Sequence, residues 1–243
     1  MMHLRRYLSA MLFLSIAFAC SSSVLAQTKG RGEIEQKIAT LRAKIEVLEK
    51  EFLEPSPEDR AAFAEFLKQP DTGLTRVLPR EKYQQKMTIA GGGSYYSFRR
   101  VTHEYGYGSD ISLEQGQFRI GFAGADYGFI ASLGDIPLQS VTLDHPGIHY
   151  LAGYKVPSSI SEIRDEQRRV SSGFESNGFK YRDSVGADDN TTYVLRSIEV
   201  RTGDTMVAFR VVRRDADGSL TLLWKILVKS PAPTVARDKE PGQ

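Results

Sequence analysis

The fold is decided by residues 193–228, which read YVLRSIEVRTGDTMVAFRVVRRDADGSLTLLWKILV. Apolar and β-branched residues alternate with polar ones in three runs, Tyr193–Val200, Thr205–Arg213 and Leu220–Val228. Successive side chains of a strand point to opposite faces, so this alternation is typical of half-buried strands. The first turn between the runs contains Gly203, and the second reads DADG. The stretch therefore predicts a three-stranded antiparallel meander.

The faces of the meander depend on how its first hairpin closes, which we place at Thr202-Gly203. One face then carries Val194, Ile198, Val200, Val207, Phe209, Val211, Leu220, Leu222, Trp224 and Ile226. We predict that this face lies in the core, and that a helix, a loop or a partner covers part of the more mixed opposite face. Arg196 falls on the predicted core face. A buried guanidinium is costly there unless a carboxylate pairs with it, and we predict such an ion pair.

The β pattern extends upstream as short runs that glycine-bearing turns separate. These runs are Tyr95–His103, Ile111–Glu114, Phe118–Phe122 and Tyr127–Leu133. Asn177-Gly178, between Phe174 and Tyr181, is a strong two-residue hairpin signal. Short helices are predicted at Pro146–Ala152 and Ser159–Val170. Together these segments predict an α+β fold, in which a helical arm precedes a mostly antiparallel sheet domain with short helices.

The arm begins with a helix that has a heptad pattern. Its large apolar residues recur at alternating spacings of four and three: Ile34, Ile38, Leu41, Ile45, Leu48 and Phe52. We call these six residues the seam. Isoleucine at heptad position a with leucine at d favours parallel two-stranded coiled coils. The flanking charges are mixed, because in a parallel pair Lys44 meets Glu49 while Lys37 faces Arg42. The seam predicts self-association or docking of a protein partner.

A second, shorter helix offers the seam another partner. Ser56 is suited to cap it, Pro57 suits its first turn, and Phe63, Phe66 and Leu67 lie on one face. The two helices could therefore fold back on each other. Residues 34–52 span about 28 Å as a helix and residues 57–68 about 18 Å. The shorter helix therefore cannot cover the whole seam, and the rest of the seam would be left to pack on the globular domain or on a second chain.

The first 26 residues have the pattern of a secretory signal peptide. Arg5 and Arg6 precede the uncharged run at residues 8–19, and cleavage is predicted between Ala26 and Gln27. Export places the protein in the periplasm or outside the cell. Two alternatives remain open. Cys20 ends a sequence that resembles a bacterial lipobox, and an uncleaved signal would act as an anchor. We expect membrane contact only in these two cases.

Composition bounds the remaining possibilities. The chain has 243 residues, 32 basic against 30 acidic, a formal net charge of +2 and one cysteine. This near-neutral balance does not indicate a nucleic-acid-binding protein, and one cysteine cannot form an intramolecular disulfide. The predicted organisation is a signal peptide at 1–26, the arm at 27–70, a β-rich globular domain at 71–230 and a disordered polar tail at 231–243.

The segment from His103 to Asp110 is the richest in chemical groups. Its tyrosines, Tyr105 and Tyr107, could stack on a sugar or a peptide, and glycines between them allow sharp turns. The same letters also describe an ordinary hairpin. We predict a ligand-binding surface that includes His103, Tyr105, Tyr107 and Asp110.

A second cluster, His145 and His149, has the spacing of two metal ligands on one helix face. Pro146 follows His145, so His145 could instead only cap the helix. The chain contains no HExxH zinc motif, no GxSxG nucleophile elbow and no phosphate-binding glycine loop. No cofactor is expected.

These observations favour an exported, bacterial-type envelope protein that works as a non-enzymatic binding or assembly module and oligomerises through its arm. The alternative is an envelope hydrolase, with or without a metal ion, that uses His103, His145 or His149.

Overall fold

The computed structural model describes residues 30–103 and 105–236. The prediction of an α+β fold is confirmed, because a helix over residues 30–53 is followed by antiparallel sheets and short helices. The chain divides between Leu48 and Glu49 into two compact units. The first contains most of the N-terminal helix, and the second, which we call the body, carries everything from Glu49 onward.

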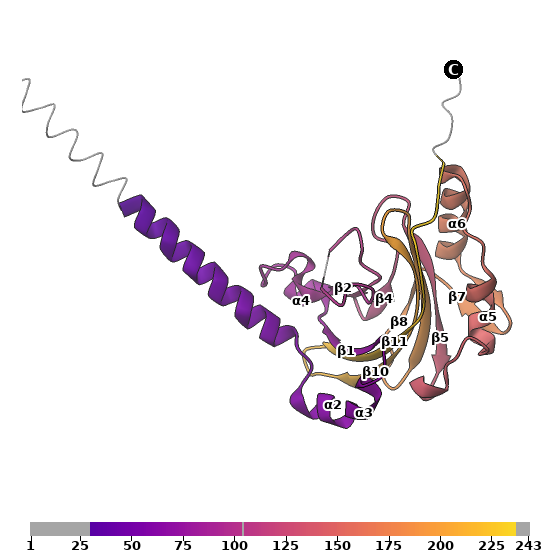
Figure 1. Ribbon diagram of the computed structural model, residues 1–243, viewed down its shortest axis with the longest axis horizontal. Helices are drawn as coiled ribbons and strands as arrows, with labels where there is room; N and C mark the ends of the chain where they lie inside the picture. The colour runs from indigo at the N-terminus through magenta and orange to yellow at the C-terminus, as the bar shows by residue number, and fades with distance from the viewer. Residues whose placement is uncertain (1–29, 104, 237–243) are drawn as a thin grey trace, which may run out of the picture. The chain divides into compact units, whose positions relative to one another are not determined.

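A five-stranded antiparallel sheet is the centre of the body (Figure 1). Its strands, in spatial order, are β1 (Thr72–Val77), β11 (Leu220–Ser230), β10 (Gly203–Arg214), β9 (Thr192–Glu199) and β5 (Tyr127–Gly134). The predicted meander is therefore present as β9, β10 and β11. Strand β1, about 150 positions earlier in the chain, completes the sheet beside β11.

The predicted faces are correct for β10 and β11 but wrong for β9. Glu199 pairs with Gly203, so a three-residue connection closes the hairpin instead of a two-residue turn. One extra residue exchanges the two faces of a strand relative to its neighbour. Tyr193 and Leu195 consequently share a face with Val207, whereas the alternate residues of β9 point to the other side.

A second antiparallel sheet covers one face of the first. It consists of β2 (Tyr95–Tyr96), β3 (Ile111–Glu114), β4 (Gln117–Arg119) and β8 (Ser184–Gly186). The predicted strand Tyr95–His103 is wrong beyond Tyr96, because the chain turns back and Ser97 pairs with Thr102. Large aromatic residues fill the space between the sheets: Tyr96, Phe98, Phe118, Tyr193, Phe209 and Trp224.

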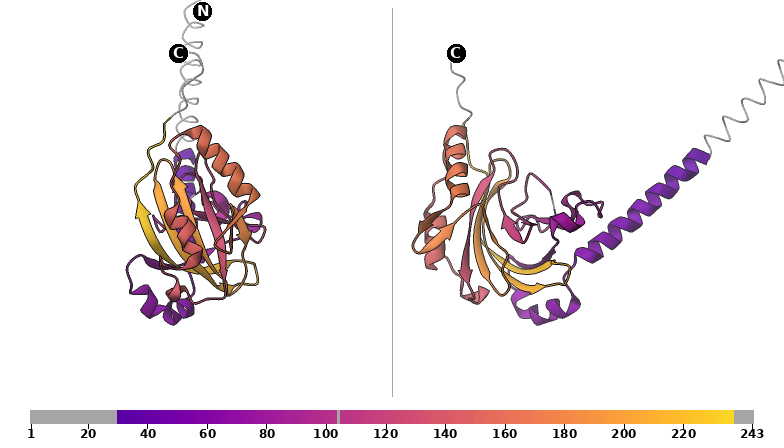
Figure 2. Two further views of the ribbon diagram at one scale, coloured as in Figure 1. Left: turned by 90° about the vertical axis from the view of Figure 1, so that its right-hand side faces the viewer. Right: turned by 180° about the vertical axis from the view of Figure 1, so that it is seen from behind.

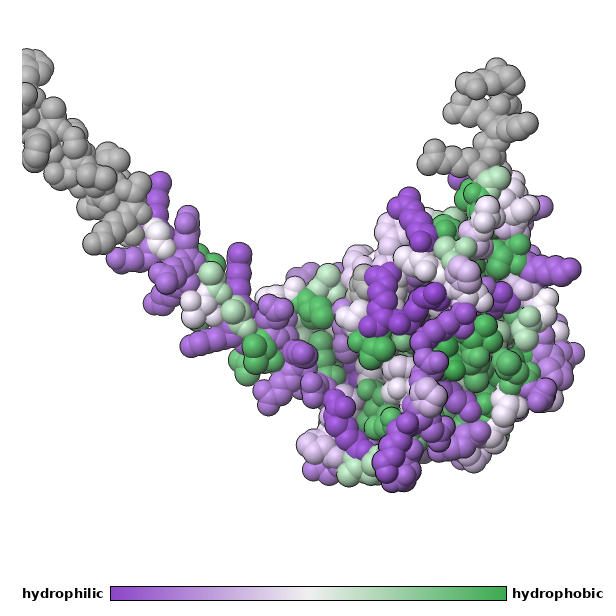
Figure 3. All heavy atoms as spheres, in the orientation of Figure 1, coloured by the Kyte–Doolittle hydropathy of each residue, from purple (hydrophilic) through white to green (hydrophobic). Residues whose placement is uncertain are grey.

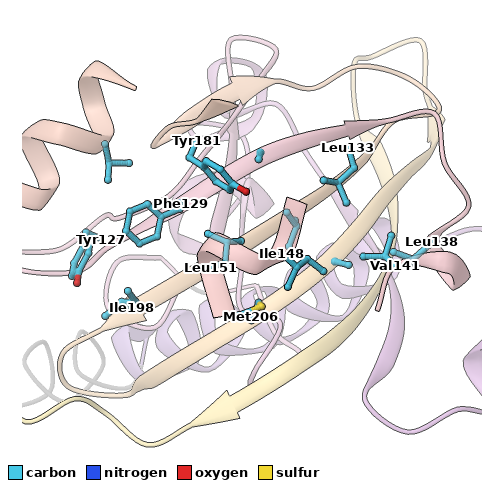
Figure 4. Packing of buried hydrophobic residues seen from close by; sticks show 14 of the residues in the cluster. Tyr127, Phe129, Leu133, Leu138, Val141, Ile148, Leu151, Tyr181, Ile198 and Met206 are labelled. Carbon is cyan, nitrogen blue, oxygen red and sulfur yellow. The ribbon is translucent and has the colours of Figure 1, made fainter. Parts of the chain in front are cut away.

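Helices cover the other face of the five-stranded sheet, as Figures 1 and 2 show. They are α5 (Pro146–Gly153) and α6 (Ile160–Ser172), joined there by the small hairpin of β6 (Phe174–Ser176) and β7 (Phe179–Tyr181). Ile148 and Leu151 of α5 and Ile163 of α6 are fully buried. Figure 4 shows Ile148 and Leu151 packed beside Phe129 and Tyr181. The prediction that the mixed face is covered is confirmed.

Local sequence explains where these helices begin. Ser159 caps α6, and its hydroxyl accepts from Glu162 N–H while the Glu162 carboxylate accepts from Ser159 N–H, which is a capping box. His145 caps α5 through Nδ1, 3.1 Å from Gly147 N. The hairpin predicted at Asn177-Gly178 is present, and both residues have the positive φ that such a turn requires.

The remaining helices are short. The predicted second helix of the arm is present in two pieces, α2 (Pro57–Ala62) and α3 (Ala64–Leu67), with Ser56 as its cap. Phe66 of α3 is buried in the core beneath the five-stranded sheet. One further α-helix, α4 (Arg80–Tyr83), and two 3₁₀ turns, η1 (Ala90–Gly93) and η2 (Leu138–Ser140), connect the strands.

Neighbouring segments bind to the lateral edges of the five-stranded sheet. Ile130 of β5 exchanges backbone hydrogen bonds with Arg182, at 2.8 and 3.1 Å. At the opposite edge Leu78 N–H, just after β1, donates to Gly93 O at 3.1 Å. The chain then continues from Arg182 into β8 and from Gly93 into β2, so the two sheets are joined at both sides.

The last described residues, 231–236, follow β11 without regular structure, and Ala236 N–H donates to Ser158 O at 2.8 Å. The rest of the predicted tail lies outside the described residues.

Candidate functional site

The structure separates the four residues of the predicted ligand-binding surface into two pairs. His103 and Asp110 point into the body, and Asp110 is only 2% exposed. Tyr105 and Tyr107 point outward, with 51% and 47% of their surfaces exposed. The tyrosines are therefore the members of the predicted set that a ligand can reach.

His103 is held by the backbone of β1. Its Nε2 lies 2.7 Å from Arg76 O, and a carbonyl oxygen only accepts, so Nε2 carries the proton. The ring packs edge-on against Tyr96, with centroids 5.1 Å apart. Burial lowers the pKa of His103, against the opposing effect of the hydrogen bond to Arg76 O. The neutral, enclosed imidazole therefore has a structural role, because it binds a backbone carbonyl of the edge strand β1.

Asp110 organises the turn that replaces the predicted strand. Its Oδ2 accepts from Phe98 N–H at 2.7 Å and lies 3.4 Å from both Arg99 N and Ser97 Oγ. Burial raises the pKa of Asp110, and these hydrogen bonds oppose the rise. The carboxyl group therefore satisfies buried donors of the chain itself.

The exposed tyrosines line a hollow with a volume of about 680 Å³. Sequence reasoning missed its other aromatic members, Tyr95 and Phe122. Tyr95 makes edge-on contacts with Tyr105 at 4.7 Å and with Phe122 at 5.0 Å between ring centroids. The Arg201 guanidinium lies over the Tyr107 ring, 4.8 Å from its centroid.

Charged side chains from three elements complete this aromatic hollow. Arg80 of α4 places Nη1 3.0 Å from Glu114 Oε1 on β3. Arg119 of β4 places Nε 3.7 Å from the other oxygen, Glu114 Oε2. Asp183 also lines the hollow, where its Oδ1 accepts from Ser184 Oγ at 3.1 Å. Two guanidinium groups and two carboxylates make the lining formally neutral.

Glycine shapes the segment that carries the exposed tyrosines. Gly108 has φ of +94°, which L-residues rarely adopt, and a Cβ there would overlap the Arg100 guanidinium. Residues 91–134 also hold nine aromatic residues, and this concentration is the sequence signal for Tyr95 and Phe122. Arg80 and Asp183 lie outside that range, and nothing in the sequence joins them to it.

His145 and His149 form no metal cluster with other described residues. Nδ1 of His145 accepts from Gly147 N–H, and Nε2 of His149 lies 2.9 Å from Asp144 O. Among residues 30–103 and 105–236, no three His, Cys, Asp or Glu side chains converge as metal ligands. Helix α5 and His103 lie on opposite faces of the five-stranded sheet, so the three histidines do not form one site.

The seam is the second candidate, on the N-terminal helix. All six of its residues are exposed, from 39% for Ile45 to 62% for Leu48. Figure 3 shows hydrophobic residues among hydrophilic ones along this helix.

The last residues of the helix, from Glu49 onward, belong to the body and contact it. Arg76 lies over the Phe52 ring at 4.7 Å, and the Glu49 carboxylate accepts from Thr88 Oγ1 at 2.7 Å.

The predicted processing residues Cys20, Ala26 and Gln27 lie outside the described residues. Within the part of the chain that the structure covers, no helix has both the length and the apolar character needed to cross a bilayer. Comparisons with protein-family models, curated proteins and solved structures found no match.

Proposed function

We propose that the protein is an exported, non-enzymatic assembly module that pairs with a second copy of itself through the seam. The observation that carries this proposal is the exposure of all six seam residues. Complete burial of a leucine or isoleucine side chain contributes roughly 1.5–3 kcal/mol. A row of such side chains left in water on one helix therefore favours a partner that covers it.

The composition of the seam favours a coiled coil of two parallel helices. Ile38 and Ile45 occupy position a, and Leu41 and Leu48 occupy position d. This arrangement is the one that parallel dimers prefer. A second copy has the same seam at the same spacing, so the seam side chains of each helix can pack between those of the other, as knobs into holes.

The flanking charges also favour the parallel orientation. In a parallel pair the two Lys44–Glu49 attractions offset the two Lys37–Arg42 repulsions. In an antiparallel pair that overlaps the whole seam, Glu35 meets Glu49, while Arg42 and Lys44 each meet their own copy. Only contacts between Lys37 and Glu51 are attractive there. Like charges outnumber opposite ones in this second arrangement.

The oligomeric state of residues 27–243, measured by sedimentation equilibrium, tests the proposal. We expect a dimer at micromolar concentrations. Leu41→Glu should give a monomer whose circular dichroism and thermal unfolding of the body are unchanged. Ala43→Glu, on the opposite side of the same helix, is the matched control and should remain dimeric. A wild-type chain that is monomeric at the highest soluble concentration contradicts the proposal, as does a dimeric Leu41→Glu.

A cysteine cross-link tests the orientation. The only natural cysteine is Cys20, so residues 27–243 contain no other thiol. In a parallel dimer position a faces itself, so Ile45→Cys should form an interchain disulfide rapidly under mild oxidation. In the antiparallel arrangement Ile45 faces Leu41 instead. A dimer that does not cross-link at position 45, but does so in a mixture of Ile45→Cys and Leu41→Cys chains, is antiparallel.

Export is supported by Arg5 and Arg6, the uncharged run and the small residues before Gln27. Intact mass of the full chain expressed in a bacterium tests it. Cleavage after Ala26 gives residues 27–243 in the periplasmic fraction, and Cys20→Ser leaves that mass and location unchanged. A membrane-bound species that Cys20→Ser releases indicates lipidation, and an uncleaved chain in the cytoplasm contradicts export.

A further inference from the structure

We infer that the aromatic hollow binds an uncharged saccharide of one or two rings. The inference does not depend on pairing through the seam, because every lining residue belongs to the body.

The exposed tyrosines provide the first argument. Among the described residues, the aromatic side chains with large exposed surfaces are Phe52, Tyr105 and Tyr107. Tyr105 and Tyr107 line the hollow, whereas Phe52 does not; the Arg201 guanidinium lies over the Tyr107 ring, so a sugar would use Tyr105 and the part of Tyr107 that Arg201 leaves exposed. Tyr105 and Tyr95 form a T-shaped pair, and Tyr105 still keeps 51% of its surface exposed. The negative face of an aromatic ring attracts the polarised C–H groups of a pyranose, which also gain burial of their apolar surface.

The charged groups provide the second argument. Sugar hydroxyls both donate and accept hydrogen bonds, so they need donors and acceptors side by side. Arg80 and Arg119 supply donors, and Glu114 between them supplies acceptors. All three side chains keep between 25% and 47% of their surfaces in solvent, so a ligand can reach them. A guanidinium and a carboxylate are both planar and bind two neighbouring hydroxyls in a bidentate manner.

Charge balance selects an uncharged ligand. Arg80 and Arg119 are matched by Glu114 and Asp183, so the lining has no net charge. A lining without net charge gives an anionic sugar no overall attraction to compensate for the water it loses on binding, so a neutral sugar is favoured. The volume of about 680 Å³ lies within the range of roughly 300–1,000 Å³ that is typical of small-molecule sites. An extended peptide is commonly held by an open strand edge, whereas the lining of this hollow includes four charged side chains.

Saturation-transfer NMR of residues 27–243 tests the inference. The probes are cellobiose, maltose and N,N′-diacetylchitobiose, with galacturonic acid as the anionic comparison. We expect transfer to the ring C–H protons of at least one neutral probe and weaker transfer to galacturonic acid. Tyr105→Ala and Tyr107→Ala should each weaken binding about tenfold, and Glu114→Gln should weaken it without removing the aromatic contacts.

Leu143→Ala is the matched control, because Leu143 is 47% exposed and does not line the hollow. It should leave binding unchanged. Thermal unfolding of each variant shows whether a loss reflects the site or the fold. The inference is overturned by absence of transfer to all three neutral probes, by stronger binding of galacturonic acid, or by binding that persists unchanged in both folded tyrosine variants. None of these outcomes depends on whether the chain is a monomer or a dimer.

Discussion

Arg196 on β9 and Asp204 on β10 form a two-point ion pair, with Nε 2.9 Å from Oδ1 and Nη2 2.6 Å from Oδ2. The same guanidinium donates from Nη1 to the carbonyls of Leu151 and Tyr154, at the C-terminal end of α5. A cation there is favoured by the helix dipole. One side chain thus connects two strands of the sheet to the helix that covers them.

Arg196→Ala should lower the free energy of unfolding by about 3–5 kcal/mol, because it leaves Asp204 and two helix carbonyls without their partner in a largely buried place. Urea unfolding measures the change. Lys68→Ala is the control, since Lys68 and Glu65 form an ion pair whose side chains are 70% and 87% exposed. Its effect should stay below about 1 kcal/mol. Equal effects of the two substitutions would show that the Arg196 network adds no stability.

His103 should make the stability of the body depend on pH. Its pKa is lowered in the folded state by burial, whereas in the unfolded chain it has its ordinary value of 6.5. Below that value the unfolded chain takes up a proton that the folded chain does not, so the free energy of unfolding falls as the pH is lowered. The loss continues until the folded pKa is reached. Above 6.5 the contribution is constant.

His103→Gln keeps a side-chain N–H for Arg76 O but cannot titrate. Urea unfolding of both proteins between about pH 5 and about pH 7.5 should show a flatter dependence for the variant. The other histidines are common to both chains and cancel in the comparison. Parallel curves would mean that His103 has the same pKa in the folded and unfolded chain.

Gly73→Ala should destabilise the body by about 1–3 kcal/mol. A Cβ at Gly73 would lie 2.2 Å from Cζ2 of Trp224, whose ring is confined between the sheets. Gly153→Ala is the control, because a Cβ there meets nothing within 4 Å, and it should be neutral or slightly stabilising. The fluorescence of Trp224, the only tryptophan, follows both unfolding curves. An unaffected Gly73→Ala would show that β1 and β11 can separate at little cost.

Local signals were sufficient to predict the meander, the Asn177-Gly178 hairpin and the heptad helix, because alternation, turn chemistry and heptad spacing act over a few residues. The face of β9 was assigned wrongly, since one additional residue in a hairpin reverses every side chain of a strand. The strand expected after Tyr96 ends early because the buried Asp110 carboxylate binds the backbone there. That contact joins residues twelve positions apart and leaves no periodic trace.

The candidate site was predictable only in part. Tyr105 and Tyr107 stand out in the sequence by composition. Their partners come from separate elements: Arg80 from α4, Glu114 from β3 and Arg119 from β4. Only the pairing of β3 with β4 and the packing of α4 bring these charges together. A single sequence contains no information on that packing beyond the general expectation that charges seek opposite partners.

The bonds at the edges of the five-stranded sheet bear on aggregation. An edge strand with free N–H and C=O groups is a template on which another chain can add a strand. Here Arg182 occupies backbone groups of β5, while His103 and Gly93 occupy groups at and just after the end of β1. Another chain would have to displace these segments before it could extend the sheet. Strand addition to the five-stranded sheet should therefore require local opening at Arg182 or Gly93.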